Sequence, residues 1–346
     1  MFNNKFLMGC LMATALFACK KSTHIDVKGD PEVKFFTLIE SPANTPANSF
    51  SYTALNIPNT GGSGWINSTN SFPSSIKFPV RASKAVGEDV TITAEIDNSL
   101  VAAYNEANDT EYQTFPADVF NLEKASATIL AGEARSMDSI VIVPDGSKLG
   151  PLVAGNYMAA IRLKTVSKPT VGSVTSNEKI NTVYIVSSVE QRQIWYNAGT
   201  ANITGTLVSP RTSWTASYDP TPVATSGGSI FDGSTGSYQR WPNGTTSGLL
   251  TVDMQSARNV SAIRLYTSNN TTYTPTRIDV YLSTDGVNYE LMGSPLKANL
   301  AYTSSYNYIV FYKPTSARYI RLRLYYSTST NTQNFRVTEF DVYATN

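Results

Sequence analysis

The stretch RIDVYLSTDGVNYELMG, residues 277–293, decides the fold of the C-terminal half of this 346-residue chain. Apolar and polar side chains alternate along its first part, which is typical of a half-buried strand. The apolar face consists of Ile278, Val280 and Leu282. Asp285 and Gly286 follow as a hairpin turn, because glycine tolerates positive φ. The stretch therefore predicts an antiparallel hairpin with one face in a core.

A second stretch, ARYIRLRLYY at 317–326, repeats this pattern. Ile320, Leu322 and Leu324 share one face, and two arginines share the other. A slip of one residue would bury both arginines, so the register is strongly specified. We expect this strand to lie in the same sandwich as the hairpin.

The N-terminal half is also rich in short alternating runs separated by turn residues. Six of these runs predict strands, at residues 33–40, 74–82, 89–97, 139–144, 157–166 and 181–189. One segment, NSLVAAYNEAN at 98–108, predicts a helix with Asn98 or Ser99 as its cap and Leu100, Ala103 and Tyr104 on one face. We therefore expect an all-β protein whose residues 31–190 form an immunoglobulin-like sandwich, followed by a second sandwich at 191–346.

The first 30 residues have a different character. The uncharged run Phe6–Phe17 is too short to span a membrane, and the sequence Leu16-Phe17-Ala18-Cys19 follows at its end. This end resembles the lipobox of bacterial lipoproteins, which implies a signal peptide at 1–18 and a lipid on Cys19. The alternative is a cleaved signal with a chance cysteine. We read residues 19–30 as a polar tether.

The rest of the chain limits the function further. Removal of residues 1–18 would leave 26 basic and 26 acidic side chains, and this balance argues against a nucleic-acid partner. Cys10 would be lost with the signal peptide, and the only histidine, His24, lies in the tether. Histidine-dependent catalytic triads and HExxH zinc sites are therefore excluded from both domains. Two-carboxylate glycoside hydrolysis stays open, but we expect no enzyme.

Seven landmarks succeed each other in the C-terminal half: WTAS (214–217), IFDGSTGSYQRW (230–241), LLTVDM (249–254), VSAIRLYTSN (260–269), VYLSTDGVNY (280–289), ARYIRLRL (317–324) and VTEFDVY (337–343). This order resembles the coagulation-factor C-type, or discoidin, domain, and within it the family 32 carbohydrate-binding modules. The resemblance covers about 145 residues. It implies a jelly-roll β-sandwich whose ligand site is built from loops at one end.

Many members of that family hold a structural calcium ion. The resemblance assigns its ligands to Asp232, to Ser237 in place of the family's threonine, and to Glu339. Oxygen ligands of this kind suit Ca²⁺. The alternative is that Asp232 caps a turn and Glu339 pairs with an arginine. The family's tryptophan also arrives late here, at Trp241, so the loop is longer than usual.

Sugar binding needs aromatic faces and planar polar groups that reach hydroxyls. Loops at the expected ligand end offer both, and an aromatic residue before the last strand often stacks on the sugar in galactose-binding relatives. The candidate residues are Tyr238, Arg240, Trp241, Asn243, Asn269, Asn270, Tyr273, Arg277, Asn334 and Phe335. The alternative for the aromatic ones is that they close the ends of the sandwich.

Residues 100–120, LVAAYNEANDTEYQTFPADVF, are similar to a motif in an uncharacterised N-terminal domain of Bacteroidota surface lipoproteins. That domain often precedes carbohydrate-related modules of polysaccharide-utilisation systems. For Tyr104, Tyr112 and Phe115 we expect core packing rather than a site.

These features together predict a non-catalytic glycan-binding lipoprotein of a polysaccharide-utilisation system. We expect it in the outer membrane, with the cell surface favoured over the periplasmic face and transporter components as further partners. The alternative is an adhesin or structural protein whose discoidin domain binds another protein, and a glycoside hydrolase accessory subunit is a third possibility. A large exposed apolar patch would favour a protein partner.

Overall fold

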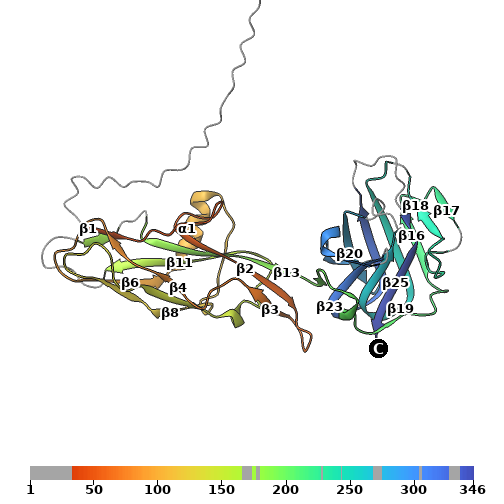
Figure 1. Ribbon diagram of the computed structural model, residues 1–346, viewed down its shortest axis with the longest axis horizontal. Helices are drawn as coiled ribbons and strands as arrows, with labels where there is room; N and C mark the ends of the chain where they lie inside the picture. Colours follow the sequence, from red (N-terminus) through yellow and green to blue (C-terminus); the bar gives the residue numbers. More distant parts are fainter. Residues whose placement is uncertain are drawn as a thin grey trace, which may run out of the picture.

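A computed structural model describes residues 33–165, 174–176, 180–226, 229–242, 244–267, 275–303, 306–326 and 336–346. These residues form two β-rich domains joined end to end (Figure 1). The predicted signal peptide, Cys19 and the tether lie outside the described residues. No helix in the described part is both long and apolar enough to cross a membrane.

The N-terminal domain consists of three sheets. The largest has the order β3-β2-β13-β11-β6-β9, with β7 beside β11, and the other two have the orders β4-β10-β8 and β12-β1-β5. The strands are β1 (Val33–Phe36), β2 (Ser49–Pro58), β3 (Trp65–Asn70), β4 (Ile76–Phe78), β5 (Arg81–Ala82), β6 (Val90–Ile96), β7 (Gln113–Thr114), β8 (Phe120–Lys124), β9 (Ser126–Ile129), β10 (Ile140–Pro144), β11 (Gly155–Thr165), β12 (Val174–Ser176) and β13 (Thr182–Gln191).

The core of this domain lies between its sheets. Ile92 on β6 and Ile161 on β11 pack in the same cluster as Phe78 on β4 and Ile142 on β10. These side chains come from both layers, so their alternation buries one face of each sheet. All six predicted strands are present, although the first ends at Phe36 and the run at 74–82 is divided between β4 and β5.

Helix α1 (Ser99–Asn108) lies where it was predicted, with Asn98 at its N-cap position and with Leu100 and Tyr104 packed against a buried cluster. Val101 is the buried residue, whereas Ala103 is exposed. The side-chain amide of Asn98 donates to the Phe115 carbonyl, and the Asn98 side chain makes no capping hydrogen bond to the helix. The expected packing is confirmed, because Tyr104 and Tyr112 contact each other and Phe115 is buried in the main core.

The C-terminal domain has one nine-stranded and one three-stranded sheet. In the nine-stranded sheet the strand order is β15-β25-β19-β23-β20-β21, and β14, β16 and β22 pair with strands of this series. In the three-stranded sheet the order is β17-β18-β24. The strands are β14 (Ile194–Trp195), β15 (Thr206–Leu207), β16 (Thr215–Asp219), β17 (Ala224–Ser226), β18 (Tyr238–Arg240), β19 (Ser247–Tyr266), β20 (Arg277–Ser283), β21 (Glu290–Gly293), β22 (Ala301–Thr303), β23 (Tyr306–Tyr325), β24 (Arg336–Val337) and β25 (Glu339–Thr345). Short 3-10 helices are η1 (Gly146–Lys148), η2 (Thr200–Asn202) and η4 (Lys297–Asn299).

Two 20-residue strands, β19 and β23, shape this domain. The pairing of β19 with β23 is interrupted between Asp253 and Arg258. Both strands bend at this point, at the same end of the sandwich. Side chains from both halves of β19, such as Leu250 and Leu265, therefore enter one core. We call the end formed by residues 255–259 and 313–317 the bend end.

The opposite end of the domain is the loop end. Here Ser247, Tyr325 and Arg277 lie side by side at the ends of β19, β23 and β20, and β18 ends nearby at Arg240. The buried face predicted for β20 is confirmed, as is the inward face of the 317–326 stretch. Gly286 adopts φ +77° in the predicted turn between β20 and β21.

The two domains meet at the bend end. The N-terminal sheet ends with β13 at Gln191, and the first C-terminal strand, β14, begins at Ile194. Across this junction, Lys313 Nζ donates to the carbonyl of Asn59 at 3.0 Å and to that of Gly62 at 2.5 Å. These carbonyls belong to the turn between β2 and β3, so a side chain of the second domain contacts the backbone of the first.

Candidate functional site

Three side chains share the outer face of the small sheet β17-β18-β24. Tyr238 and Arg240 are two residues apart on β18, so they point the same way. Arg240 lies directly opposite Arg336 on β24. The Arg336 guanidinium carbon lies 5.3 Å from the centroid of the Tyr238 ring. We call Tyr238, Arg240 and Arg336 the Arg–Tyr–Arg patch.

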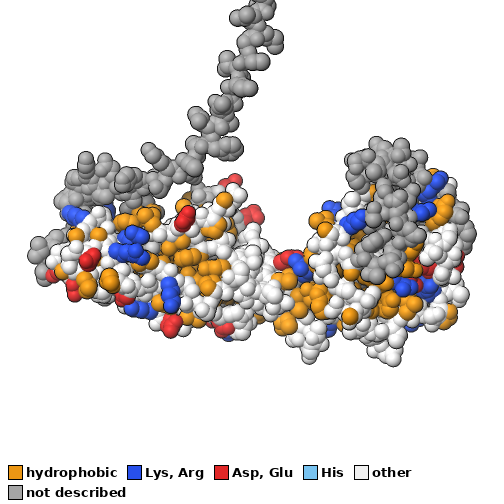
Figure 2. Space-filling model, in the orientation of Figure 1, with side chains coloured by type: hydrophobic (Ala, Val, Ile, Leu, Met, Phe, Trp, Pro, Cys, Tyr) orange, Lys and Arg blue, Asp and Glu red, His pale blue; other side chains and the backbone are white. Residues whose placement is uncertain are grey.

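The patch is half-buried and positively charged. Figure 2 shows Lys or Arg side chains beside hydrophobic surface where Figure 1 draws β17 and β18. Within the described residues, Arg240 forms no ion pair, and its buried Nε has no hydrogen-bond partner. Guanidinium groups stay charged at all physiological pH values. The patch therefore offers planar, cationic donors next to an aromatic ring.

A second arginine-tyrosine unit lies at the loop end. Arg277, at the start of β20, places its Nε 3.2 Å from Asp279 Oδ1. Its guanidinium carbon lies 3.8 Å from the centroid of the Tyr325 ring, and the Tyr325 hydroxyl donates to Asp279 Oδ2 at 2.8 Å. These contacts hold Arg277 in one orientation at the end of the sheet.

Trp241 does not belong to the surface, and its predicted role in stacking on a sugar is wrong. Its side chain has 0% exposure and packs edge-on against Tyr218, with ring centroids 5.8 Å apart. Alternation along the chain explains this placement, because Trp241 follows outward-facing Arg240 and so points inward. A Cβ at Gly248 would lie 2.6 Å from the indole, so Trp241 requires glycine opposite it.

The other predicted sugar contacts divide into two groups. Tyr238, Arg240 and Arg277 lie at the loop end, in or beside the units just described. The remaining six lie outside the described residues and stay predictions: Asn243, Asn269, Asn270, Tyr273, Asn334 and Phe335.

The three residues predicted to bind calcium lie in one region. Asp232 Oδ2 accepts a hydrogen bond from Ser237 Oγ at 2.8 Å, and Asp232 Oδ1 accepts one from the Ser234 amide. The Gly233 amide donates to Glu339 Oε1 at 3.2 Å, so the loop that carries Asp232 contacts Glu339. The sequence also allowed that Asp232 caps a turn and that Glu339 pairs with an arginine, and both features are present. Asp232 caps this turn, and Arg211 Nη1 lies 2.7 Å from Glu339 Oε1.

The prediction of a calcium ion at these residues rests on one buried oxygen. Glu339 Oε2 is buried and has no hydrogen-bond partner among the described residues. Burial raises the pKa of Glu339 to about 7, against the opposing effect of Arg211. The described residues contain no group of three or more His, Cys, Asp or Glu side chains placed to hold a metal. Calcium ligation here would therefore depend on Asp232, Ser237 and Glu339 together with backbone carbonyls.

Sequence reasoning allowed an arginine beside Glu339 but missed which arginine it is and the ion pairs of the neighbouring Asp341. Arg211 Nη1 also lies 2.5 Å from Asp341 Oδ1, and Arg264 Nε lies 2.7 Å from Asp341 Oδ2. Alternation along β25 places Glu339 and Asp341 on one face, which is a signal that the sequence contains. Arg211 lies 128 residues from Glu339 in the chain, and no local pattern predicts that pairing.

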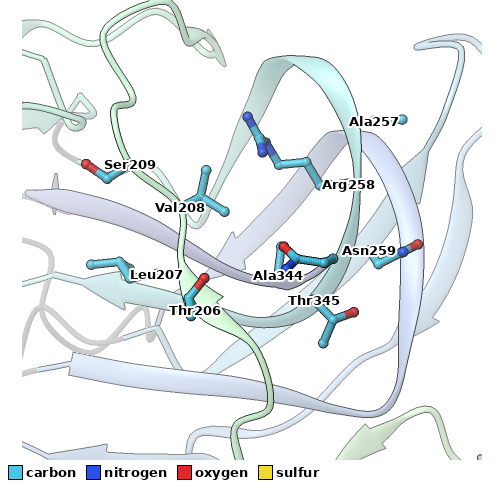
Figure 3. Close-up of a pocket in the computed structure, with 10 residues that line it drawn as sticks. Thr206, Leu207, Val208, Ser209, Ala257, Arg258, Asn259, Ala344 and Thr345 are labelled. Carbon is cyan, nitrogen blue, oxygen red and sulfur yellow. The ribbon is translucent and has the colours of Figure 1, made fainter.

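The bend end contains a cavity of about 360 Å³ (Figure 3). Arg258 extends from the bend of β19 toward the segment that carries Val208 and Ser209. The lining residues are Thr206, Leu207, Val208, Ser209, Ala257, Arg258, Asn259, Ala344, Thr345 and Asn346. This lining includes no aromatic ring, so the cavity lacks the stacking surface that the loop end offers.

Comparison with protein families identifies two regions of the chain. A model of the F5/8 type C domain matches residues 209–343, and a model described only as a "-like, N-terminal domain" matches residues 52–170. A comparison with curated proteins found no match.

Several solved structures are similar to the chain. A two-domain protein of unknown function from Bacteroides fragilis is 17% identical, with a TM-score of 0.46, over 91% of this chain and 95% of that one. The C-terminal domain of a chitobiase from B. fragilis is 22% identical, with a TM-score of 0.33, over 40% and 98%. A family 32 carbohydrate-binding module from Clostridium perfringens, in complex with galactose, is 19% identical, with a TM-score of 0.34, over 40% and 99%.

The match to the F5/8 type C domain confirms the resemblance to discoidin domains that the order of the seven sequence landmarks indicated. It covers the C-terminal domain from the residues just after β15 to Tyr343 on β25. The protein is all-β, and its C-terminal domain is a discoidin-type, or F5/8 type C, domain.

Proposed function

We propose that this protein is a non-catalytic, membrane-anchored lipoprotein that binds glycans at the loop end of its C-terminal domain. The observation that carries the proposal is the gathering of arginine and tyrosine side chains at one end of an F5/8 type C domain. Protein–sugar contacts combine aromatic faces with planar groups that donate to hydroxyls. The loop end has both kinds of group on strands that the core holds in place.

The two units at this end have complementary roles in the proposal. Tyr238 supplies an aromatic ring, and its neighbours Arg240 and Arg336 supply cationic groups beside it. Arg277 is oriented by Asp279 and Tyr325, so it donates with little loss of conformational freedom on binding. Calcium, held by Asp232, Ser237 and Glu339, would fix the loop before β18.

The remaining features of the proposal concern where the protein acts. A lipid on Cys19 and the 19–30 tether would hold the two domains at the outer membrane, on the cell surface, close to transporter components. There the protein would retain polysaccharide or glycoprotein glycans for uptake. The only histidine precedes both domains, which supports a role without histidine-dependent catalysis.

Glycan binding is tested with the full chain on a broad array, followed by calorimetry. We expect micromolar-to-millimolar affinity, about −4 to −8 kcal/mol, because such sites are shallow and solvated. Tyr238→Ala should abolish detectable binding. Tyr289→Ala is the matched control, since Arg321 covers that ring at 3.5 Å at the opposite end. If wild type bound no glycan, a protein partner would become the better hypothesis.

Lipid anchoring is tested by detergent phase separation. Cys19→Ala should leave the detergent phase, because the variant has no thiol to carry the lipid. Cys10→Ala is the control and should partition like wild type, since Cys10 would be removed with the signal peptide. Equal partition of Cys19→Ala and wild type would contradict the anchor.

A further inference from the structure

Arg258 lies on the face of β19 that is turned toward the core of the C-terminal domain. It is directly opposite Ala317 on β23 and two residues before Val260, and both of these have 0% exposure. Directly opposite residues of an antiparallel pair, and residues two apart on one strand, project from the same face of the sheet. The pairing therefore directs a charged side chain inward at the bend end.

The guanidinium group of Arg258 has no partner among the described residues. It forms no ion pair there, and its Nε is buried without a hydrogen-bond partner. The neighbouring Arg318, by contrast, donates to both carboxylate oxygens of Asp253. A guanidinium stays charged at physiological pH, and holding a charged group away from water is unfavourable unless it is paired. An anion from outside the chain would supply the missing partner.

The segments that surround Arg258 carry no acidic side chain. Residues 191–218, which include β15, contain no Asp or Glu, and neither do residues 254–278 or 342–346. Asp341, which precedes the last of these segments, is paired with Arg211 and Arg264. The charge of Arg258 is therefore left for a ligand.

The cavity at the bend end gives such a ligand room, since Arg258 lines it and extends across it toward Val208 (Figure 3). Its volume of about 360 Å³ lies near the lower limit of the range typical of ligand pockets, about 300–1,000 Å³. Thr206 and Ser209 line it from the segment that Arg258 faces, and no Asp or Glu side chain lines it. Hydroxyl groups both donate and accept hydrogen bonds, so this lining suits a hydroxylated ligand.

We infer that this cavity is a second binding site, which takes a small hydroxylated molecule whose carboxylate or sulfate group lies on the Arg258 guanidinium. The planar guanidinium matches the oxygens of such groups, and charge-assisted hydrogen bonds are about twice as strong as neutral ones. An acidic monosaccharide has the charge, the hydroxyls and the size that the cavity requires. The site is independent of the glycan site proposed at the loop end, because the two lie at opposite ends of one sandwich.

The test compares acidic and neutral monosaccharides by calorimetry with the full chain at constant ionic strength. The probes are galacturonate, galactose 6-sulfate, galactose and inorganic sulfate. We expect one of the two acidic sugars to bind at least about 10-fold more tightly than galactose, and the acid that does so identifies the group as carboxylate or sulfate. It should also bind more tightly than inorganic sulfate, because only the sugar has hydroxyls that meet Thr206 and Ser209.

Variants locate the binding. Arg258→Gln should remove the preference for the acidic sugar, and Arg258→Lys should retain part of it. Thr206→Val keeps the shape of the side chain but removes its hydroxyl, and it should weaken binding about 3- to 10-fold. The matched control is Arg135→Gln, which removes the same charge from an exposed position of the N-terminal domain and should leave binding unchanged. Circular dichroism checks that each variant is folded.

The loop end is tested separately with Tyr238→Ala, which should leave binding of the acidic monosaccharide unchanged. If Tyr238→Ala abolished that binding and Arg258→Gln did not, the acid would bind at the loop end, and the cavity site would be excluded while glycan binding stood. If acidic and neutral sugars bound equally, or if Arg135→Gln acted like Arg258→Gln, the cavity site would also be excluded. If no glycan bound at the loop end but the acid still required Arg258, only the proposed function would fall.

Discussion

The two ends of the C-terminal sandwich are built from the same strands but differ in what they present. At the bend end, β19 and β23 turn over, and Lys313 contacts the N-terminal domain through the carbonyls of Asn59 and Gly62. At the loop end, the same strands start and finish, and arginine and tyrosine side chains gather. One end therefore contacts the N-terminal domain, and the other carries the candidate site.

This difference also separates stability from binding. Residues such as Trp241 and Leu322 connect the ends through one core, with no exposure to solvent. Tyr238 and Arg240 stand on that core and are partly exposed. Changes in the first group should unfold the domain, and changes in the second should alter only what it binds.

The largest expected effect comes from Trp241→Ala. Removal of a fully buried Trp side chain typically costs about 3–5 kcal/mol of unfolding free energy, because it leaves a cavity. Tyr238→Ala should lower the free energy of unfolding far less, because the Tyr238 ring is partly exposed. Tyr238 lies two positions before Arg240 on β18. Urea denaturation of the C-terminal domain in the full chain measures both. Equal stability of the two variants would show that Trp241 is not a core residue.

Calcium should produce the next largest effect. If the ion binds only the folded state, calcium at 100 times its Kd should add about 2.7 kcal/mol of stability by mass action. Melting temperature with calcium and with chelator measures this, and Asp232→Asn should lose most of the shift. Superimposable melting curves under both conditions would argue against a metal beside Glu339.

A smaller effect is expected at the junction of the domains. Lys313→Met keeps the length of the side chain but removes the donor that contacts Asn59 and Gly62. We expect a larger radius of gyration in small-angle scattering, with each domain still folded, because the domains would sample more orientations. Lys77→Met on β4 is the charge-matched control. An unchanged scattering profile for Lys313→Met would show that other contacts fix the junction.

The smallest effect concerns an ion pair at the bend end. Arg318 donates to both carboxylate oxygens of Asp253, at 2.8 and 2.9 Å, and this contact holds the pKa of Asp253 below its usual value of 3.8. The pair therefore stabilises the fold above that value, and the contribution is lost as pH falls through the lowered pKa. Asp253→Asn should melt earlier than wild type near neutral pH, and the gap should close in acid. A gap independent of pH would exclude the charge as its cause.

Local patterns predicted much of the fold, because alternation decides which side chains a strand buries. Ile320, Leu322 and Leu324 point inward as their spacing required. The same alternation, applied to the residue after Arg240, predicts that the Trp241 side chain points into the core. Its position near a loop suggested a surface role instead.

The site was less accessible to sequence reasoning, because its contacts join distant parts of the chain. Arg240 and Arg336 meet only through the pairing of β18 with β24. Arg211 and Glu339 are 128 residues apart, and Lys313 contacts a turn about 250 residues earlier in the sequence. Periodicity carries no information about such pairings. The order of the seven landmarks predicted the domain, whereas only the folded chain brought the patch together.

Hydrogen exchange tests the central claim, that a glycan binds at the loop end, most directly. The full chain is compared with and without the oligosaccharide that binds best on the array. Slower exchange of backbone amides in residues 238–241 and 336–337, with no change in 255–259 and 313–317, is the result that we predict. Protection confined to the bend end, at a concentration where calorimetry shows saturation, would contradict it.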